Sequence, residues 1–284
     1  MSQSLLQIKN RIRSIENTKK ITRAMEMVAA AKLKPLENQL RIAKKYSLKI
    51  ESLLNNLLSQ GVVCKHPFLE QRREIKRIAV CVVTSDTGLC GSYNHNIIRA
   101  TEEFLSTQGA LSVDLVCVGK KGYNYFRKRK ACIIASYNEF HGKYADEAVN
   151  ALVAVLSGLF LSGKADKIYL AYTKFTSSSR QAPCVDTFLN LEASVGKDVD
   201  YLIEPDSATV LTELIATFIN AKMRTVLLDA FISEHSSRVM AMGEATDNAK
   251  ELLEELVLLR NKVRQASITR DIMEIVSAAE ALKG

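Results

Sequence analysis

The segment VLTELIATFINAKMRTVLL (residues 210–228) decides the fold, because it opens a helical pattern that continues to the end of the chain. Between Asp206 and Gly284 there is no proline, and Gly243 is the single internal glycine. Apolar residues recur at spacings of three and four, which places them on one stripe of a helix. The stripe consists of Val210, Leu211, Leu214, Ile215, Phe218, Ile219, Met223, Val226 and Leu227, then Leu252, Leu253, Leu256, Val257, Ile268, Ile272, Ile275 and Val276. Such a helix is on the order of 100 Å long. No single core is that wide, so we expect the helix to protrude and to pack against a partner.

The amino-terminal segment is the predicted partner. Its stripe is Leu5, Ile8, Ile12 and Ile15, and after a shift of phase Ile21, Met25, Val28, Leu36, Leu40, Ala43, Ser47, Ile50, Leu54 and Leu57. Two narrow stripes at opposite ends of one chain predict an antiparallel two-helix coiled coil. The shift of phase predicts an irregular coil. Pro35 lacks a backbone donor, so it predicts a kink or a break in the first helix.

The middle of the chain alternates strands and helices. Predicted strands cover 75–84, 113–118, 131–136, 167–175 and 184–191, and predicted helices cover 94–106, 123–128 and 145–161. This alternation is typical of a Rossmann-like α/β domain with a mainly parallel sheet, and the last two strands predict an antiparallel hairpin. The predicted organisation is a first helix over 1–58, a central α/β domain over 59–205 and a last helix over 206–284.

Composition indicates an ordinary globular protein of a reducing compartment. The chain is 47% hydrophobic and 25% charged. It has no uncharged apolar run of the roughly 18 residues that a membrane span requires, and no apolar signal core or transit peptide is evident. Its six cysteines (64, 81, 90, 117, 132 and 184) form no CxxC pair. We expect buried free thiols rather than disulfides or a zinc site.

Charge is concentrated at the amino end. Residues 1–55 hold 12 basic and 4 acidic side chains, and residues 209–284 hold 9 basic and 11 acidic ones. The first helix therefore carries an excess of cations that complements the last helix and remains available for an acidic surface. Nucleic acid, anionic lipid, an acidic protein and solvent alone are all compatible with this excess.

Nothing in the sequence commits the chain to catalysis. The turn at Gly88 follows a strand and opens a helix, where phosphates often bind, but it is not GxGxxG. The stretch 119–122 (GKKG) lacks the spacing of a phosphate loop. Cys90 in the turn could be an activated thiolate, although a packed turn cysteine is the better expectation. The histidines 66, 95, 141 and 235 have no ligand spacing. We expect no metal and no cofactor.

Several separated motifs resemble one family. They are IKNRIRSI (8–15), TKKITRAMEMVAAAK (18–32), SDTGLCG (85–91) with Asn94, YLIEP (201–205), SEH (233–235), RVMAM (238–242), ATDNA (245–249), NKVRQASIT (261–269) and EIV (274–276). In content and order they are similar to the gamma subunit of F-type ATP synthase, over essentially the whole chain. The sequence departs from that family's pattern at Thr87, Gly243 and Asp271.

This resemblance implies a central rotor shaft. Its terminal helices would turn inside a ring of alpha and beta subunits, and its α/β domain would bind the epsilon subunit and the membrane c-ring. Ion flow would turn ring and shaft together, and the shaft would set and regulate the nucleotide state of catalytic sites on the beta subunits. The implied location is the cytoplasmic face of a bacterial inner membrane, peripheral to it, without nucleic acid.

The resemblance also assigns residues. Met25, Arg238, Arg264, Gln265 and Thr269 match positions that couple the shaft to the ring. Gly88, Leu89, Cys90 and Gly91 match a turn on the epsilon and c-ring side. Gln265 and Thr269 lie four apart on one helix face, so a joint contact is geometrically reasonable.

Two rival functions remain on the sequence alone. One is a coiled-coil scaffold or nucleic-acid-binding protein that uses the basic first helix, for which salt-sensitive DNA binding would be evidence. The other is a nucleotide-dependent enzyme of the α/β domain, for which ATP turnover by the isolated chain would be evidence.

Overall fold

The structure is a computed structural model that describes residues 4–59, 66–70, 72, 74–109, 111–140, 142, 144–177, 180–191, 201, 203, 204 and 206–282. Cys64, His141, Leu202 and Pro205, which carried sequence-based expectations, lie outside these residues. Two very long helices bracket the chain: α1 spans Leu5–Ser59 and α5 spans Ser207–Ala281. α1 is continuous through Pro35, so of the predicted kink or break the break does not occur.

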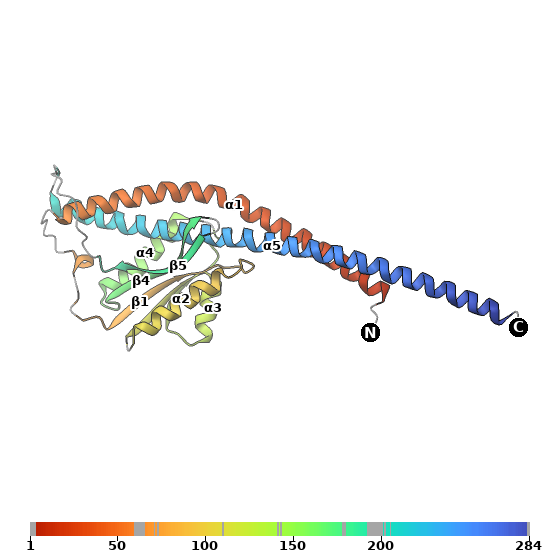
Figure 1. Ribbon diagram of the computed structural model, residues 1–284. Helices are drawn as coiled ribbons and strands as arrows, with labels where there is room; N and C mark the ends of the chain where they lie inside the picture. Colours follow the sequence, from red (N-terminus) through yellow and green to blue (C-terminus); the bar gives the residue numbers. More distant parts are fainter. Residues whose placement is uncertain are drawn as a thin grey trace. The chain divides into compact units, whose positions relative to one another are not determined.

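By internal packing the chain divides into two units, one of Met1–Val28 with Val239–Gly284 and one of Ala29–Arg238. Both helices contribute to both units. The second unit contains the α/β domain, whose elements are visible in Figure 1. They are η1 (Pro67–Leu69), β1 (Arg77–Val83), α2 (Tyr93–Thr107), β2 (Ser112–Val118), α3 (Lys120–Lys128), β3 (Ile133–Tyr137), α4 (Asp146–Leu161), β4 (Lys167–Ser177) and β5 (Arg180–Leu189).

The sheet has the strand order β3-β2-β1-β4-β5. The first four strands are parallel, and β5 returns antiparallel to β4. The predicted fold class, with its mainly parallel sheet and closing hairpin, is confirmed. β5 begins at Arg180, four residues before its predicted start, and includes Pro183 opposite Thr173. A strand at the edge of a sheet tolerates proline, because one side of its backbone has no neighbour to bond.

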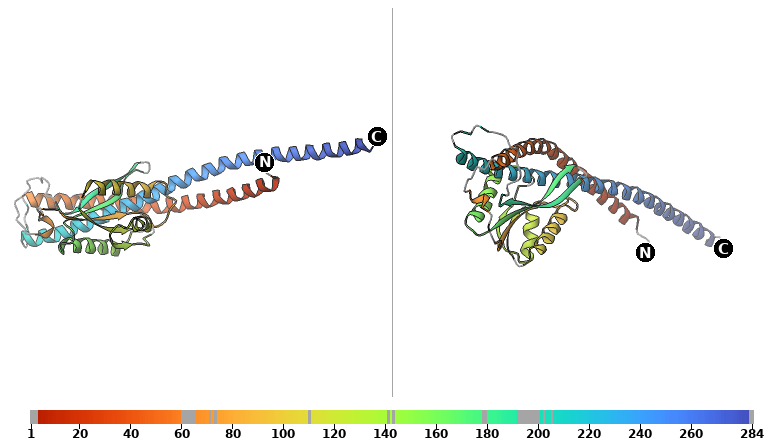
Figure 2. Two further views of the ribbon diagram at one scale, coloured as in Figure 1. Left: turned by 90° about the horizontal axis from the view of Figure 1, so that it is seen from below. Right: turned by 60° about the vertical axis from the view of Figure 1, so that its left-hand side comes forward.

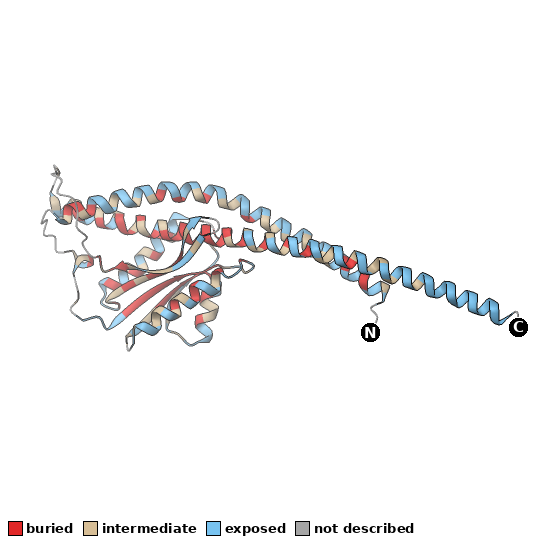
Figure 3. Ribbon diagram, in the orientation of Figure 1, coloured by how far each residue is buried: buried red, intermediate tan, exposed pale blue. Residues whose placement is uncertain are grey.

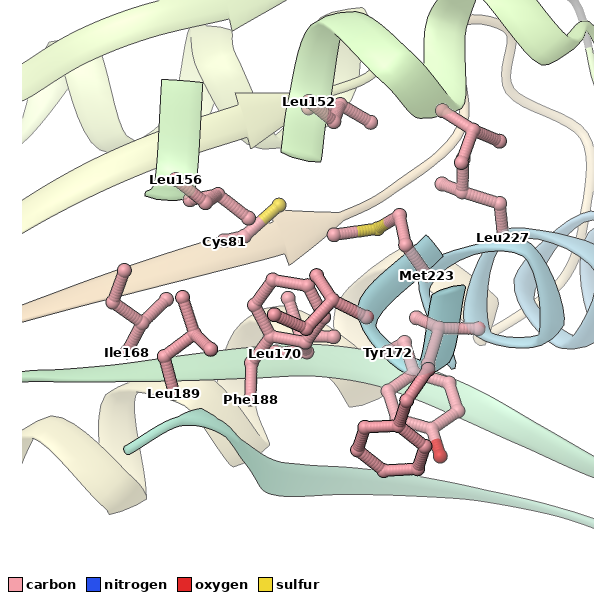
Figure 4. Close-up of a cluster of buried hydrophobic side chains, with 14 of the residues drawn as sticks. Cys81, Leu152, Leu156, Ile168, Leu170, Tyr172, Phe188, Leu189, Met223 and Leu227 are labelled. Atoms are coloured by element: carbon pink, nitrogen blue, oxygen red, sulfur yellow. The ribbon is translucent and has the colours of Figure 1, made fainter. Parts of the chain in front are cut away.

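Successive side chains of β1 point to opposite faces of the sheet and contribute to a hydrophobic core on each face. Ala79, Cys81 and Val83 pack with residues of α4, α5 and α1, whereas Ile78, Val80 and Val82 pack with α2 and α3. Figure 4 shows the first core, where Leu152 and Leu156 of α4 and Met223 and Leu227 of α5 meet the strands. Such runs, apolar on both sides, are typical of a parallel sheet covered by helices on both faces.

In the second unit α1 and α5 are antiparallel neighbours. Glu51 and Leu54 of α1 line one pocket with Phe218 and Lys222 of α5, whereas Lys44 meets Asp229, so the residue numbers fall along α5 as they rise along α1. The Lys44 ammonium lies 2.8 Å from the carboxylate of Asp229, whose side chain is 3% exposed. A buried carboxylate needs such a partner. Burial raises the pKa of Asp229, while the hydrogen bond and charge of Lys44 lower it.

The first unit is a second antiparallel pairing of the same helices. Ile8 and Ile12 pack against Leu256, and the hydroxyls of Thr22 and Thr246 are 2.8 Å apart. As the numbers rise along α1 they fall along α5, so this pairing is antiparallel as predicted. Figure 2 shows the two segments side by side, with the end of α5 continuing beyond the start of α1.

Two details of the predicted stripes are wrong. Ile21 and Val28 are 60% and 58% exposed, because Thr22, Met25 and Ala29 occupy the inner side of α1 instead. Near the end of α5, the apolar side chains are more than half exposed at Ile268, Ile272, Ile275 and Val276. α1 begins at Leu5 and does not extend far enough along α5 to cover them. Figure 3 shows this uncovered end of α5.

Candidate functional site

The turn between β1 and α2 is held rigidly by a local polar network. Asn94 is its centre: its Oδ1 accepts from the backbone N–H of Ser85 at 3.0 Å, and its Nδ2 donates to the hydroxyl of Ser85 at 2.7 Å and the sulfur of Cys90 at 3.2 Å. Leu89 and Gly91 both have positive φ, near 60° and 56°. This geometry pushes the Leu89 side chain outward, where it is 60% exposed, and turns Cys90 inward, where it is 2% exposed.

The Cys90 thiol is a packed group. Burial raises its pKa, and the hydrogen bond between Cys90 and Ser85 and the charge of Arg238 only partly oppose that rise. A thiol with a raised pKa is a poor nucleophile at neutral pH. The activated-thiolate alternative is therefore not supported. The cysteines that the structure describes are all free; Cys81 and Cys117 are buried too, but Cys132 is exposed and Cys184 half-buried, contrary to the expectation of buried thiols throughout.

Arg238 of α5 reaches the same turn. Its guanidinium donates to the carboxylate of Glu234 at 2.7 Å and to the Thr87 hydroxyl at 3.1 Å. Arg238 is 7% exposed and Glu234 2%. Burial raises the pKa of Glu234, and the charge and hydrogen bond of Arg238 lower it. Arg238 and the Gly88 turn, which the resemblance assigned to two separate contact regions, thus form one site inside the second unit.

His235 extends this buried cluster to a second loop. Its Nε2 lies 3.2 Å from the carbonyl oxygen of Gly142, and its Nδ1 lies 3.2 Å from a guanidinium nitrogen of Arg238. The pKa of His235 is lowered to about 4, chiefly by burial and also by the charges of Arg238 and Lys32, while the hydrogen bond to Gly142 opposes the shift. The imidazole is neutral at physiological pH. Sequence spacing gave no sign of this role, because the four histidines have no ligand spacing.

The glycines of the GKKG stretch serve packing. A Cβ on Gly119, whose φ is +89°, would lie 2.1 Å from the carbonyl oxygen of Thr84, and one on Gly122 would lie 2.8 Å from the Thr84 hydroxyl. The backbone N–H of Gly122 donates to that hydroxyl at 2.9 Å. These glycines let α3 approach the end of β1, so their presence needs no phosphate. No group of three or more metal-ligating side chains occurs within the described ranges.

The remaining predicted contact residues belong to the first unit. Met25 is half-buried on the inner side of α1. Arg264, Gln265 and Thr269 are exposed on the part of α5 that has no partner among the described residues. The structure does not bring these three together with Arg238, which lies in the other unit. Lys19, Lys20 and Arg23, with Glu16 and Leu253, line a basic depression in the first unit.

The fold and this distribution of groups define a class of protein in which an α/β domain is inserted between two terminal helices that pair with each other. Comparison with known proteins gives the family. The family model described as ATP synthase matches residues 4–282. The ATP synthase gamma chain of Protochlamydia amoebophila is 37% identical over 99% of both chains, and that of Cupriavidus necator is 37% identical over 97% of this chain and 98% of the relative. The chain belongs to the ATP synthase gamma chain family.

Solved structures agree on the fold. A chain of the Euglena gracilis mitochondrial ATP synthase OSCP/F1/c-ring structure, in rotational state 3, has a TM-score of 0.68 at 14% identity over 98% of this chain and 94% of that one. A chain of the Tetrahymena thermophila central stalk and c-ring structure has a TM-score of 0.61 at 21% identity over 79% and 99%. Membership confirms the central-shaft role and makes this chain a non-catalytic subunit.

Proposed function

We propose that the uncovered end of α5 turns inside the ring of alpha and beta subunits of an ATP synthase, while the α/β domain binds the epsilon subunit and the c-ring. The observation that carries this proposal is the exposed apolar stripe of α5. Ile268, Ile272 and Ile275 are 51%, 55% and 69% exposed along one side of a helix without a described partner. Apolar surface of this extent on a helix favours an apolar enclosure.

The cations of the first unit support the same proposal. Arg264 is exposed near the start of the uncovered stretch. The depression lined by Lys19, Lys20 and Arg23 holds one anion, Glu16, and Arg23 is paired with Glu26 at 2.9 Å. An acidic surface on a beta subunit would complement them. Exposed ion pairs contribute about 1 kcal/mol or less each, so such contacts form and break easily during rotation.

The proposed location is the cytoplasmic face of a bacterial inner membrane. Both relatives cited above are bacterial gamma chains. Among the helices of the described part, none is long and apolar enough to cross a bilayer.

Co-purification tests the proposal. A tagged chain should emerge in single copy with alpha and beta subunits, and the Ile268→Asp/Ile275→Asp variant should bind an alpha-beta assembly about tenfold more weakly or worse, because two apolar contacts are lost. Ser277→Asp/Ala281→Asp is the matched control, since it adds the same two charges on the opposite side of the same exposed segment. Equal binding by both variants would contradict the enclosure of this stripe.

A further inference from the structure

α5 buries a run of polar side chains where a helix packed on a sheet ordinarily buries apolar ones. Ser233, Glu234, His235 and Ser236 are 0–2% exposed and Arg238 is 7% exposed. Removing two charges from water is costly, and a buried ion pair often stabilises a fold no better than apolar residues of the same volume. Stability alone therefore gives no reason for this run.

Arg238 connects α5 to one loop. Its Nη2 donates to the Glu234 carboxylate, to the Thr87 hydroxyl, and at the limit of 3.5 Å to the carbonyl oxygen of Gly88. Glu234 precedes Arg238 by one helical turn, so it holds the guanidinium from the helix side. Charge-assisted hydrogen bonds of this kind are strong and directional.

His235 connects α5 to a second loop. Arginine nitrogens only donate, so Nδ1 of His235 must accept from Arg238, and its proton sits on Nε2. Nε2–H then donates to the carbonyl oxygen of Gly142. A Cβ on Gly142, whose φ is +64°, would lie 2.4 Å from Nε2, so the loop backbone approaches the ring as closely as glycine permits.

We propose that Glu234, His235 and Arg238 are positioning residues that form a torsional clamp, fixing the rotational setting of α5 against the α/β domain. The proposal rests on the proposed function, in which the α/β domain is driven and α5 transmits the rotation. The buried apolar side of α5 already prevents a large rotation of this helix. Apolar contacts are non-directional, however, whereas hydrogen bonds to two separate loops are directional and define the rotational setting of the helix more finely.

The test variant is Glu234→Gln/Arg238→Met, which removes both charges of the buried ion pair together. Its control is Arg99→Met/Glu103→Gln, which removes an exposed ion pair of the same spacing in α2, at 2.8 Å with side chains 69% and 64% exposed. In the isolated chain, we expect amide exchange over residues 85–91 to accelerate about tenfold or more in the test variant and to stay unchanged in the control. Unchanged exchange in the test variant would overturn the clamp.

The assembled complex supplies the second readout. We expect the test variant to hydrolyse ATP but to pump several-fold fewer ions per ATP hydrolysed, because the rotational setting of α5 against the domain is less firmly held. If the number of ions pumped per ATP is normal although amide exchange over residues 85–91 is accelerated, the torsional role is overturned. If the double variant fails to fold, Arg238→Lys is the deciding variant. Lysine keeps the ion pair with Glu234 but lacks the second nitrogen of the guanidinium group, so the number of ions pumped per ATP should fall by a smaller amount. An unchanged number of ions per ATP in this variant would refute the clamp. Failure of the unaltered chain to enter any complex would instead refute the proposed function and leave the exchange result standing.

Discussion

At the scale of single residues, Gly119 shows how tightly α3 is docked on the sheet. Gly119→Ala would place a methyl group 2.1 Å from a backbone oxygen that cannot move independently, and would force a positive φ on alanine. We expect a loss of about 2 kcal/mol or more of unfolding free energy, measured by denaturant titration.

The control is Gly158→Ala in α4. A Cβ there meets nothing within 4 Å, so the change should stabilise the chain slightly, by at most about 1 kcal/mol of helix propensity. Equal effects at the two glycines would contradict the close approach of α3 to Thr84.

His235 predicts the acid sensitivity of the second unit. Because its folded pKa of about 4 lies below the ordinary value of 6.5, the unfolded chain binds the proton first as pH falls. The associated stability is complete above pH 6.5 and is lost progressively down to about pH 4, by an amount of order 3 kcal/mol. The facing charges Arg238 and Lys32 are both positive and oppose protonation.

Unfolding free energy measured between pH 7 and pH 4 checks this. His235→Gln should flatten the acid limb relative to the unaltered chain, while substitution of His95, which is exposed on α2, should not. The difference between the two variants removes contributions from the carboxylates. An acid limb that His235→Gln leaves unchanged would show that the ring is not held neutral.

At the scale of elements, the first unit depends on a short apolar contact. Leu256 is 4% exposed against Ile8 and Ile12, whereas Leu258 on the other side of α5 is 69% exposed. Leu256→Ala should cost about 2–3 kcal/mol in the local opening of residues 245–262, measured by hydrogen exchange. Leu258→Ala should change the same opening by no more than about 0.5 kcal/mol, and similar values for both would contradict the pairing.

The helices and strands were predicted well from the sequence, because the apolar residues in each of them recur at a regular spacing. The five strands and the long helices follow from apolar alternation and from stripes of three and four residues. The residues at the contact between α1 and α5 were harder to predict, because an apolar stripe is identified from its large apolar residues. In the structure a small polar pair, Thr22 with Thr246, fills part of this contact, and Ile21 and Val28 face outward.

The candidate site was less accessible to sequence reasoning for a related reason. The turn at Gly88 was visible as a motif, and Arg238 through family resemblance. Their contact depends on how α5 lies on the domain, which no local pattern encodes. Glu234 and His235 were missed as site residues because charged residues in a helix are normally solvated, and only tertiary packing reveals that these are buried.

At the scale of the whole molecule, the central claim is that the first and last helices act as one shaft. The Thr22 and Thr246 hydroxyls, 2.8 Å apart, mark where a Thr22→Cys/Thr246→Cys pair could form a disulfide, in a chain whose Cys64, Cys132 and Cys184 are replaced by serine. The decisive measurement is ATP-driven ion pumping by the complex before and after oxidation of this pair. We predict a high yield of cross-link and unchanged pumping, because the two helices turn together. Failure to cross-link, or pumping that stops on oxidation and returns on reduction, would contradict a shaft made of both helices.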